Sequence, residues 1–371
     1  MEMILLEECC EILDSMRIPI TAKDRKKGPY PYYVANGVQD YVADYIFDDE
    51  LVLLAEDGGN FGSEKKPIAY KVSGKCWVNN HAHVLKPKVN IDVDYLCYSL
   101  MFYKVEGMVN GATRMKLTQA AMRKMLIPKR EIKEQKEIVG ILNKIQTLLK
   151  LVRGQIERYD ELIKSRFVEM FGDIFVADSF PLAQLSELAD IGSSKRIYAN
   201  EYVDEGIPFY RSKEIRELGA GMKPSIELFI KPERYNEIKK KYGVPQIGDI
   251  LVAAIGATIG YTWIVDTESP FYYKDGNLIS LSIKDGVNSS FLDYVLGIVI
   301  ADYKNKGVAG SAQLALTIEK LEKIQVVNPD IELQNQFAAF VHQVDKLKAI
   351  TKKSMDEFQI LFDSLMQQYF G

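Results

Sequence analysis

The sequence predicts an α+β protein in which two mixed α/β domains alternate with two long helices. The segment from Gly111 to Gly172 recurs from Gly310 to Gly371, and each copy ends in a sustained heptad pattern. The two remaining parts of the chain contain short apolar runs separated by turn residues. We therefore expect a pseudo-twofold internal repeat, with domains at residues 1–128 and 173–327 and repeated helices at residues 129–172 and 328–371.

Composition places the chain among ordinary globular proteins. Its 371 residues allow two or three domains, and a hydrophobic content of 47% supplies a core for each. No apolar run reaches the length of a membrane span, the N-terminus lacks the pattern of a signal peptide, and the four cysteines are too few for a disulfide framework. We expect a soluble, cytoplasmic protein with reduced thiols. The net charge of −4 means that any affinity for nucleic acid must come from local basic clusters.

The repeat keeps its register without a gap. The offset of 199 residues from Thr118 to Thr317 also places Gln135 on Gln334 and Phe171 on Phe370. Two unrelated amphipathic helices would not keep the flanking Gly and Leu-Thr residues in register. Upstream the match is looser and its offset changes, so we expect different insertions in the two globular parts. The aligned upstream residues are Leu6, Glu8 and Ile12 with Leu185, Glu187 and Ile191.

Each repeat ends in a helix that is too long for an ordinary globular core. At ~1.5 Å per residue, about 40 residues make a rod of about 60 Å that cannot bury its apolar stripe alone. We expect the two helices to pair antiparallel as an intramolecular coiled coil between the domains, and we expect the wider stripe of the second helix to bind another protein as well. The alternative is two core helices of one domain. The pairing and docking residues are Ile138, Leu142, Ile145, Leu149, Val152, Ile156, Tyr159 and Ile163 in the first helix, and Phe337, Val341, Val344, Leu347, Phe358, Phe362 and Leu365 in the second.

Local clusters of basic and amide residues occur in both halves. Lys and Arg bind phosphates, whereas Asn, Gln, Arg and Ser hydrogen-bond to base edges. A solvated surface explains any single cluster, but their presence in both halves on turn-rich segments favours DNA binding. The first-half candidates are Lys23, Arg25, Lys26, Lys27, Asn36, Lys65, Lys66, Asn79, Asn80, Arg114 and Lys116. The second-half candidates are Lys195, Arg196, Arg211, Ser212, Lys213, Lys274, Asn277 and Gln313.

Several motifs follow one another in the same order in the two halves. They are Ala35-Asn36-Gly37, Asn79-Asn80-His81 and Ile127-Pro128 with Gln135 in the first half, and Gly248-Asp249-Ile250-Leu251-Val252, Gly256-Ala257-Thr258-Ile259-Gly260, Asp275-Gly276-Asn277-Leu278, Gly310-Ser311-Ala312-Gln313 and Pro329 with Gln334 in the second. In this order, and over essentially the whole chain, they resemble the specificity subunits of type I restriction–modification systems.

The resemblance implies a function in DNA recognition. Each domain would read one half of a bipartite target, which would be asymmetric because the two domains differ in sequence. The helices would hold the readers apart and dock two methyltransferase (modification) subunits that carry S-adenosylmethionine, and restriction subunits would join for cleavage. The chain itself would be non-catalytic and would bind no cofactor and no metal.

The sequence lacks a catalytic motif of its own. There is no Asn-Pro-Pro-aromatic motif of a methyltransferase, and the glycines at 256 and 260 lack the Lys-Ser/Thr of a phosphate loop. Asp57 with Glu64-Lys65-Lys66 has the residue types of a metal-dependent nuclease, but it lies in a Gly/Ser-rich loop. A zinc site is disfavoured because no Cys-x2-Cys pair is present. The residues considered for zinc are Cys9, Cys10, Cys76, His81, His83 and Cys97.

Two other functions remain as alternatives. The chain could be a non-enzymatic protein-assembly adaptor with long helical arms, which DNA affinity and its salt dependence would distinguish from a DNA reader. An autonomous enzyme is disfavoured by the missing chemistry.

Overall fold

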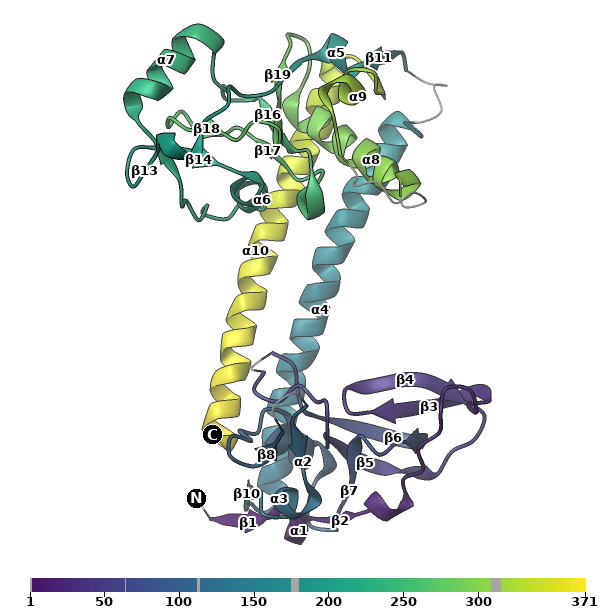
Figure 1. Ribbon diagram of the computed structural model, residues 1–371. Coiled ribbons are helices and arrows are strands. Elements are labelled where there is room, and N and C mark those ends of the chain that lie inside the picture. The colour runs from purple at the N-terminus through teal and green to yellow at the C-terminus, as the bar shows by residue number, and fades with distance from the viewer. Residues whose placement is uncertain (1, 64, 112–113, 175–179, 308–314) are drawn as a thin grey trace. The chain divides into compact units, whose positions relative to one another are not determined.

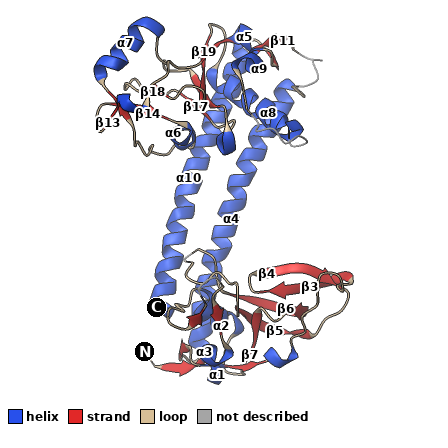
Figure 2. Cartoon of the chain, in the orientation of Figure 1, coloured by secondary structure: helices blue, strands red, loops and turns tan. Residues whose placement is uncertain are grey.

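The computed structural model describes the chain except for residues 1, 64, 112–113, 175–179 and 308–314. The chain divides into two compact units: unit 1 contains Met1–Gln155 and Thr351–Gly371, and unit 2 contains Ile156–Ile350. Strands and helices, red and blue in Figure 2, occur in both units, so each unit is mixed α/β. Within the described ranges, no helix is long and apolar enough to cross a membrane.

Unit 1 is built on a mixed sheet whose described strands follow the order β2-β7-β5-β6-β3-β4 (Figure 1). Among the described neighbours in this sheet, only β3 and β6 pair in parallel. The apolar run Leu51–Ala55 is buried throughout, because its alternating side chains pack into one core cluster on each face of the sheet. The strands are β2 (Cys10–Ile12), β3 (Lys27–Val34), β4 (Gly37–Val42), β5 (Phe47–Ala55), β6 (Ala69–Val78) and β7 (Ala82–Pro87).

Shorter elements complete unit 1. The helix α2 (Val93–Met101) begins at Asp92, whose carboxylate caps it by accepting bonds from two backbone N–H groups, and its apolar face covers one side of the sheet. The hairpin of β3 and β4 turns at Ala35-Asn36, followed by Gly37 with a φ of 116° that favours glycine. The remaining elements are β1 (Met3–Leu5), α1 (Leu6–Cys9), η1 (Asp14–Met16), β8 (Val109–Asn110), β9 (Lys116–Leu117), α3 (Gln119–Arg123) and β10 (Leu126–Pro128).

Unit 2 contains two small sheets in its described part, with the strand orders β12-β19-β16-β17 and β13-β15-β14-β18. The strands are β11 (Leu182–Gln184), β12 (Ala189–Gly192), β13 (Tyr202–Val203), β14 (Ile207–Tyr210), β15 (Phe229–Ile230), β16 (Ile250–Ala253), β17 (Thr262–Ile264), β18 (Tyr272–Tyr273), β19 (Leu278–Ile283) and β20 (Gln325–Val327). The helices are α5 (Leu185–Leu188), η2 (Ala199–Glu201), α6 (Ser212–Gly219), α7 (Pro232–Tyr242), η3 (Gly256–Thr258), α8 (Ser289–Gly307) and α9 (Ile318–Glu322).

The duplicated sequence folds into duplicated local structure. The order β2-β7-β5-β6 in unit 1 recurs as β12-β19-β16-β17 in unit 2, and the antiparallel pair of β1 with β10 recurs as β11 with β20. The N–H of Leu6 donates to the Met125 carbonyl at 2.8 Å, and the N–H of Leu185 donates to the Ile324 carbonyl at 2.9 Å. These four residues are related by the offsets found in the sequence.

The two units differ where the sequence match is loose. In unit 1, β6 is one continuous strand that pairs with both β5 and β3. In unit 2 the same pairings belong to two strands, because β17 pairs with β16 and β18 pairs in parallel with β14. The helices α6 and α7 are extra elements of unit 2 between β14 and β16.

Two long helices, α4 (Ile132–Phe171) and α10 (Ile331–Phe370), each contribute residues to both units. In unit 1 the buried residues Ile138, Leu142 and Ile145 of α4 share a core cluster with Phe362 of α10. Leu149, Phe358 and Leu365 pack against that cluster. Val152 is half-buried.

In unit 2, Ile163 of α4 shares a core cluster with Phe337 and Val344 of α10. Tyr159 and Val341 pack against this cluster, and Ile156 is half-buried. Leu347 is 50% exposed, so it lies outside the buried seam.

A buried glutamine joins each long helix to the globular part of its unit. Gln135 accepts a bond from the Asp92 N–H at 2.8 Å and donates to the carbonyls of Asn90 and Arg130 at 3.0 and 2.9 Å. Gln334, one repeat later, accepts from the Asn288 N–H at 2.9 Å and donates to the Pro329 carbonyl at 2.8 Å. Both glutamines are 0% exposed, so each helix start is tied to the start of α2 or α8.

Candidate DNA interface

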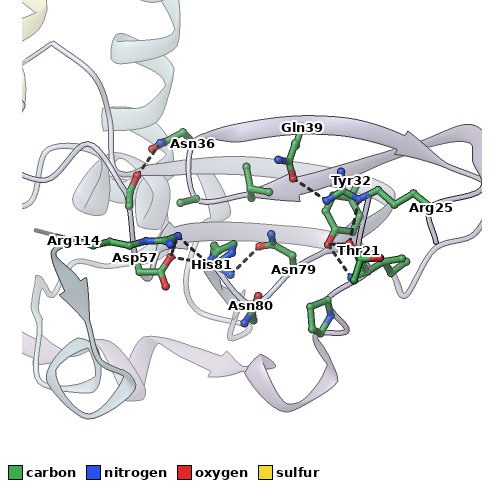
Figure 3. A pocket seen from close by; sticks show the side chains of 15 residues that line it. Thr21, Arg25, Tyr32, Asn36, Gln39, Asp57, Asn79, Asn80, His81 and Arg114 are labelled. Atoms are coloured by element: carbon green, nitrogen blue, oxygen red, sulfur yellow. Dashed lines mark hydrogen bonds and ion pairs between the residues drawn. The ribbon is translucent and has the colours of Figure 1, made fainter. Parts of the chain in front are cut away.

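An open pocket of about 540 Å³ lies in unit 1 where several strands of the mixed sheet end (Figure 3). It collects residues from the loop before β3, the β3–β4 hairpin, the end of β5, the turn between β6 and β7, and the segment before β9. Most of its polar side chains are amides, arginines or imidazole, which are groups that hydrogen-bond to bases and phosphates. The lining residues are Pro19, Ile20, Thr21, Arg25, Tyr32, Val34, Ala35, Asn36, Gln39, Asp57, Gly58, Asn79, Asn80, His81 and Arg114.

The amides of this pocket differ in how much of their hydrogen-bonding capacity the protein already uses. Asn36 donates to the Gly58 carbonyl at 3.0 Å, and Gln39 accepts from Arg25 at 3.1 Å. Asn79 is 4% exposed, and its oxygen accepts the His81 N–H at 2.8 Å. The exposed side chain of Asn80 has no hydrogen-bond partner among the described residues.

Arg25 is held firmly in the wall of the pocket. Its guanidinium lies 4.3 Å from the ring centroid of Tyr32 and donates to the Ile20 carbonyl at 3.2 Å. It also forms an ion pair with Asp40 at 3.4 Å, and its side chain is only 13% exposed. Arg25 therefore shapes the pocket and orients Gln39.

Arg114, His81 and Asp57 form a second polar group at the rim. The Asp57 carboxylate lies 2.7 Å from Arg114 Nη2 and 2.6 Å from His81 Nδ1. The Arg114 side chain is 58% exposed. An exposed ion pair of this kind is weak, so Arg114 can exchange Asp57 for a phosphate at small cost.

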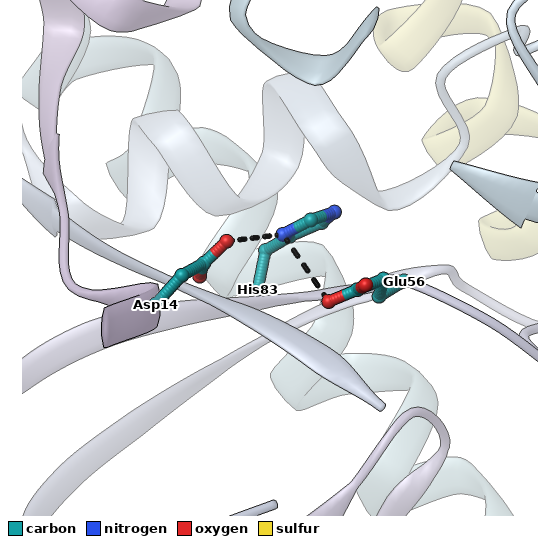
Figure 4. Close-up of side chains that lie close together, drawn as sticks. All are labelled: Asp14, Glu56 and His83. Carbon is teal, nitrogen blue, oxygen red and sulfur yellow. Dashed lines mark hydrogen bonds and ion pairs between the residues drawn. The ribbon is translucent and has the colours of Figure 1, made fainter. Parts of the chain in front are cut away.

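A second group of charged residues is buried and includes Glu56, the neighbour of Asp57 in the chain; Figure 4 shows its members Asp14, Glu56 and His83. His83 Nδ1 lies 2.6 Å from Asp14 and 3.7 Å from Glu56. Arg17 donates to Glu56 at 2.6 Å, and Lys116 Nζ lies 3.0 Å from the other oxygen of Glu56. The Lys116 side chain is therefore engaged by a carboxylate, and it ties β9 to the end of β5.

Charge compensation keeps both carboxylates of this group ionised. Burial alone would raise the pKa of Asp14, but hydrogen bonds and charge from His83, the Val84 N–H and Arg17 outweigh it and hold the pKa below its ordinary value. The same balance, with bonds from Arg17 and Lys116, lowers the pKa of Glu56. The ligand-type atoms of Asp14, Glu56 and His83 are close together, but each side chain already has protein partners. Both carboxylates bind Arg17, and the two ring nitrogens of His83 bind the Asp14 carboxylate and the Leu117 carbonyl. The arrangement is that of a structural ion cluster.

Unit 2 has the same backbone connections at the corresponding loop. The N–H of Leu316 donates to the Ala254 carbonyl at 2.8 Å, and the N–H of Ala254 donates to the Asn277 carbonyl at 2.8 Å. In unit 1, Leu117, Glu56 and His81 make the equivalent bonds at 2.7 and 2.9 Å. Asn277 thus stands where unit 1 has His81, and Ala254 stands where unit 1 has Glu56. The backbone is repeated, whereas the side-chain chemistry is not.

Most predicted cations of unit 2 are paired within the unit. Arg211 Nη2 lies 2.8 Å from both Glu214 and Glu227, and Lys213 lies 2.6 Å from Glu227. Bonds from Lys213 and Arg211 lower the pKa of Glu227 to about 2. Ser212 between them is the first residue of α6.

The other predicted residues of unit 2 lie around the turn that leads into β19. Arg196 donates to Asp275 at 2.8 Å, and the N–H of Lys274 donates to the Tyr210 carbonyl at 2.9 Å. Lys195 Nζ lies 5.4 Å from the ring centroid of Tyr242. Gln313, the remaining candidate, lies outside the described residues.

Apart from Lys116, the lysines predicted in the first half are exposed and have no ion-pair partner within the described ranges. Lys23, Lys26 and Lys27 lie on the segment that carries Arg25 into the pocket wall. Lys65 and Lys66 lie on the loop between β5 and β6. All five are available for phosphates, unlike Arg211 and Lys213.

Sequence reasoning missed Gln39 and the pairing of His81 with Asp57. Gln39 enters the pocket because the tight hairpin after Val34 returns the chain along β3. The predicted Asn36-Gly37 turn was a usable signal for it. The sequence singled out Asp57 only as a nuclease-type carboxylate, and no local signal linked it to His81, which it approaches because β5 and β7 are paired neighbours.

The four cysteines considered for zinc are all buried and free. Burial raises the pKa of Cys9 to about 11 and that of Cys10, Cys76 and Cys97 to about 12, as expected of packed thiols. His81 and His83 instead bind carboxylates.

These features define a protein with two chemically different polar sites on a duplicated local fold. The family described as type I restriction modification DNA specificity domain matches residues 1–158 and 180–358. The chain belongs to this family. This confirms the prediction that the protein is the non-catalytic subunit that supplies DNA specificity in a type I restriction–modification system.

Individual relatives agree with the family match. A provisionally named type I restriction enzyme specificity subunit of Haemophilus influenzae is 29% identical over 98% of this chain and 92% of its own. The type I restriction enzyme MjaVIII specificity subunit of Methanocaldococcus jannaschii is 24% identical over 96% of this chain and 89% of its own. The crystal structure of the type I S subunit from M. genitalium has a similar fold, with a TM-score of 0.61 and 15% identity over 100% of this chain and 96% of that chain.

Proposed function

We propose that the globular part of each unit binds one half of a bipartite, asymmetric DNA target. In this proposal residues 1–128 and 173–327 are the readers, and residues 129–172 and 328–371 are the spacer helices. The observation that carries it is the loop that precedes β7 and β19. Its backbone bonds are the same in both units, but unit 1 places Asn79, Asn80 and His81 there, whereas unit 2 places Lys274 and Asn277 there. Two related readers with different side chains recognise two different half-sites.

We propose that α4 and α10 pair antiparallel as the spacer. Two contacts support this direction. In unit 1, Arg130 at the start of α4 donates to the Tyr369 carbonyl at the end of α10, at 3.4 Å. In unit 2, Asp160 in the second half of α4 forms an ion pair with Lys348 in the first half of α10. The order of the contacts is opposite in the two helices.

Two methyltransferase subunits dock on the long helices in this proposal, and they carry the S-adenosylmethionine. Support comes from large apolar side chains that stay exposed in pairs three residues apart, and therefore on one face of each helix. Leu148 and Leu151 of α4 are 40% and 63% exposed, and Leu347 and Ile350 of α10 are 50% and 65% exposed. Restriction subunits join the same complex for cleavage, and the complex acts in the cytoplasm.

The test is the methylation pattern of the host genome with and without this chain. Removing the gene is expected to abolish methylation at one motif that has two unlike half-sites separated by a fixed number of unspecified base pairs. Restoring the gene is expected to restore that motif. If methylation does not depend on the gene, or if the dependent motif is continuous or palindromic, the proposed function is wrong.

A further inference from the structure

We propose that Asn80 determines specificity by reading an adenine in the half-site bound by unit 1. The inference rests on the proposed function and adds the base and the residue that reads it. An Asn or Gln side chain can accept from adenine N6 and donate to adenine N7 at once, which no other base edge in the major groove permits. Among the amides that line the pocket, Asn80 alone has both halves of its side chain without a partner within the described residues.

The turn that carries Asn80 is fixed on both sides. On the preceding side, the N–H of Asn79 donates to the Tyr33 carbonyl at 3.1 Å. On the following side, the His81 N–H binds the Asn79 oxygen at 2.8 Å, and the His81 carbonyl accepts the Glu56 N–H at 2.9 Å. Figure 3 shows Asn80 on this turn, beside the bonded pair of Asn79 and His81. A reader held on a rigid backbone loses little conformational freedom on binding, which favours discrimination between bases.

The other polar groups of the pocket are less suited to specify a base. Arg25 and Arg114 could select guanine, but Arg25 is paired with Asp40 and only 13% exposed, and the exchangeable Arg114 is assigned to a phosphate in this proposal. Asn36 and Gln39 each use part of their amide within the protein. In this proposal these residues frame the base pair that Asn80 contacts, and the exposed lysines on the Arg25 segment bind the neighbouring phosphates.

The corresponding position in unit 2 carries different chemistry. Lys274 makes the backbone bond to Tyr210 that Asn79 makes to Tyr33, and Asn277 corresponds to His81, so two residues, Asp275 and Gly276, take the place of Asn80. The Asp275 carboxylate accepts from Arg196 at 2.8 Å. Changing Asn80 is therefore expected to alter one half-site only.

The first experiment maps the methylated motif of the complete complex containing Asn80→Ala, Asn80→Asp or the control Asn90→Ala. Asn90 is an exposed asparagine after the opposite end of β7. N80A is expected to relax one A·T position in one half-site to any base. N80D is expected to shift that position toward cytosine, whose N4 group donates to a carboxylate. N90A is expected to leave the motif unchanged.

The second experiment measures DNA binding, so it does not require a variant that still methylates DNA. The wild-type complex is bound to duplexes of its motif in which each adenine in turn is replaced by 7-deazaadenine, which lacks the N7 acceptor. One position in the unit 1 half-site is expected to lose affinity by about 5- to 100-fold, and N80A is expected to show no further loss there.

The two failures can be told apart. A wild-type motif that is not bipartite overturns the proposed function. A bipartite motif in which N80A leaves every position unchanged, or in which no adenine of either half-site responds to 7-deazaadenine, overturns the assignment of Asn80 alone.

Discussion

Among single residues, Asp14 has the largest structural role at the candidate interface. Its carboxylate accepts bonds from His83, Val84 and Gln119 while it lies 3.5 Å from Arg17. His83 and Val84 belong to β7 and Gln119 to α3, and all three are far from Asp14 in the sequence. The group therefore links η1, β7 and α3. Removing one member would leave the other charges buried without compensation.

Asp14→Asn is expected to destabilise unit 1 by about 3 kcal/mol at neutral pH. The folded-state pKa of Asp14 lies below the ordinary value, so its contribution is fully present above the unfolded value of ~3.9 and is lost as the pH falls through the folded value. Because Asn does not titrate, the stability of D14N should fall less than that of the parent chain as the pH is lowered. The chain has two tryptophans, so in a W263F background the fluorescence of Trp77 reports unfolding of unit 1. Urea unfolding of both chains at several pH values below about 5 measures the difference.

Asp48→Asn is the matched control for this measurement. Asp48 is exposed on β5, and its substitution is expected to change stability by less than about 0.5 kcal/mol. Equal stability and equal acid dependence of D14N and the parent chain would show that the buried cluster does not stabilise unit 1.

The exposed lysines next to Arg25 in the sequence are expected to contribute to DNA binding through phosphate contacts. Replacing Lys23, Lys26 and Lys27 by alanine removes up to three phosphate contacts. Each contact contributes about 0.9 to the slope of log affinity against log salt concentration, so the slope should become shallower by up to about 2.7. Titration of the full chain with a duplex at several salt concentrations checks this value. Alanine at the exposed Lys133 and Lys136 of α4 is the control, and an equal change there would indicate a general charge effect.

Among the elements, the junction between each long helix and its globular part is the most regular feature of the repeat. Gln135→Leu removes the acceptor for the Asp92 N–H and the donor for two carbonyls at a fully buried position. Groups left buried without partners cost about 1–3 kcal/mol each, so a loss of roughly 2–4 kcal/mol is expected.

Gln334→Leu supplies the matched experiment in the other unit. In single-tryptophan chains, Q135L should destabilise the unit reported by Trp77, and Q334L should destabilise the unit reported by Trp263. Wild-type stability of both variants would exclude the glutamines as structural links. An equal effect of each variant on both reporters would indicate that the units unfold together.

The elements also show what sequence alone could predict. The helices and the repeat were predictable because the 199-residue offset preserves apolar spacing, and because Gln135 and Gln334 occupy equivalent positions. The pocket was not predictable as a site. Asn80 and Arg114 are separated by many residues, and both line the pocket only because β5 pairs with β7 while a bridge between Asp57 and Lys116 brings the segment before β9 to the end of β5. Hydrophobic periodicity indicates that a strand exists, but it does not indicate its neighbour.

At the scale of the whole molecule, the proposed function requires α4 and α10 to set the separation of the half-sites. Inserting four helical residues after Gln155 in α4 would lengthen the helix by about 6 Å. This length is close to two base-pair steps of ~3.4 Å. The unspecified gap of the methylated motif should then increase by one or two base pairs, because each reader keeps its own side chains and shifts only along the DNA. The methylation motif of the complex containing the insertion measures the gap directly.

The control keeps the length of the helix and changes only its surface. Alanine at the exposed Lys150 and Arg153 of α4 should leave both the gap and the half-sites unchanged. A four-residue insertion that alters the bases of either half-site, while the gap keeps its length, would show that the helix is not a spacer. Such a result would indicate that the helix instead affects how a reader contacts its bases. Because the insertion and the base-reading variants change different parts of the motif, the same sequencing measurement separates spacing from recognition.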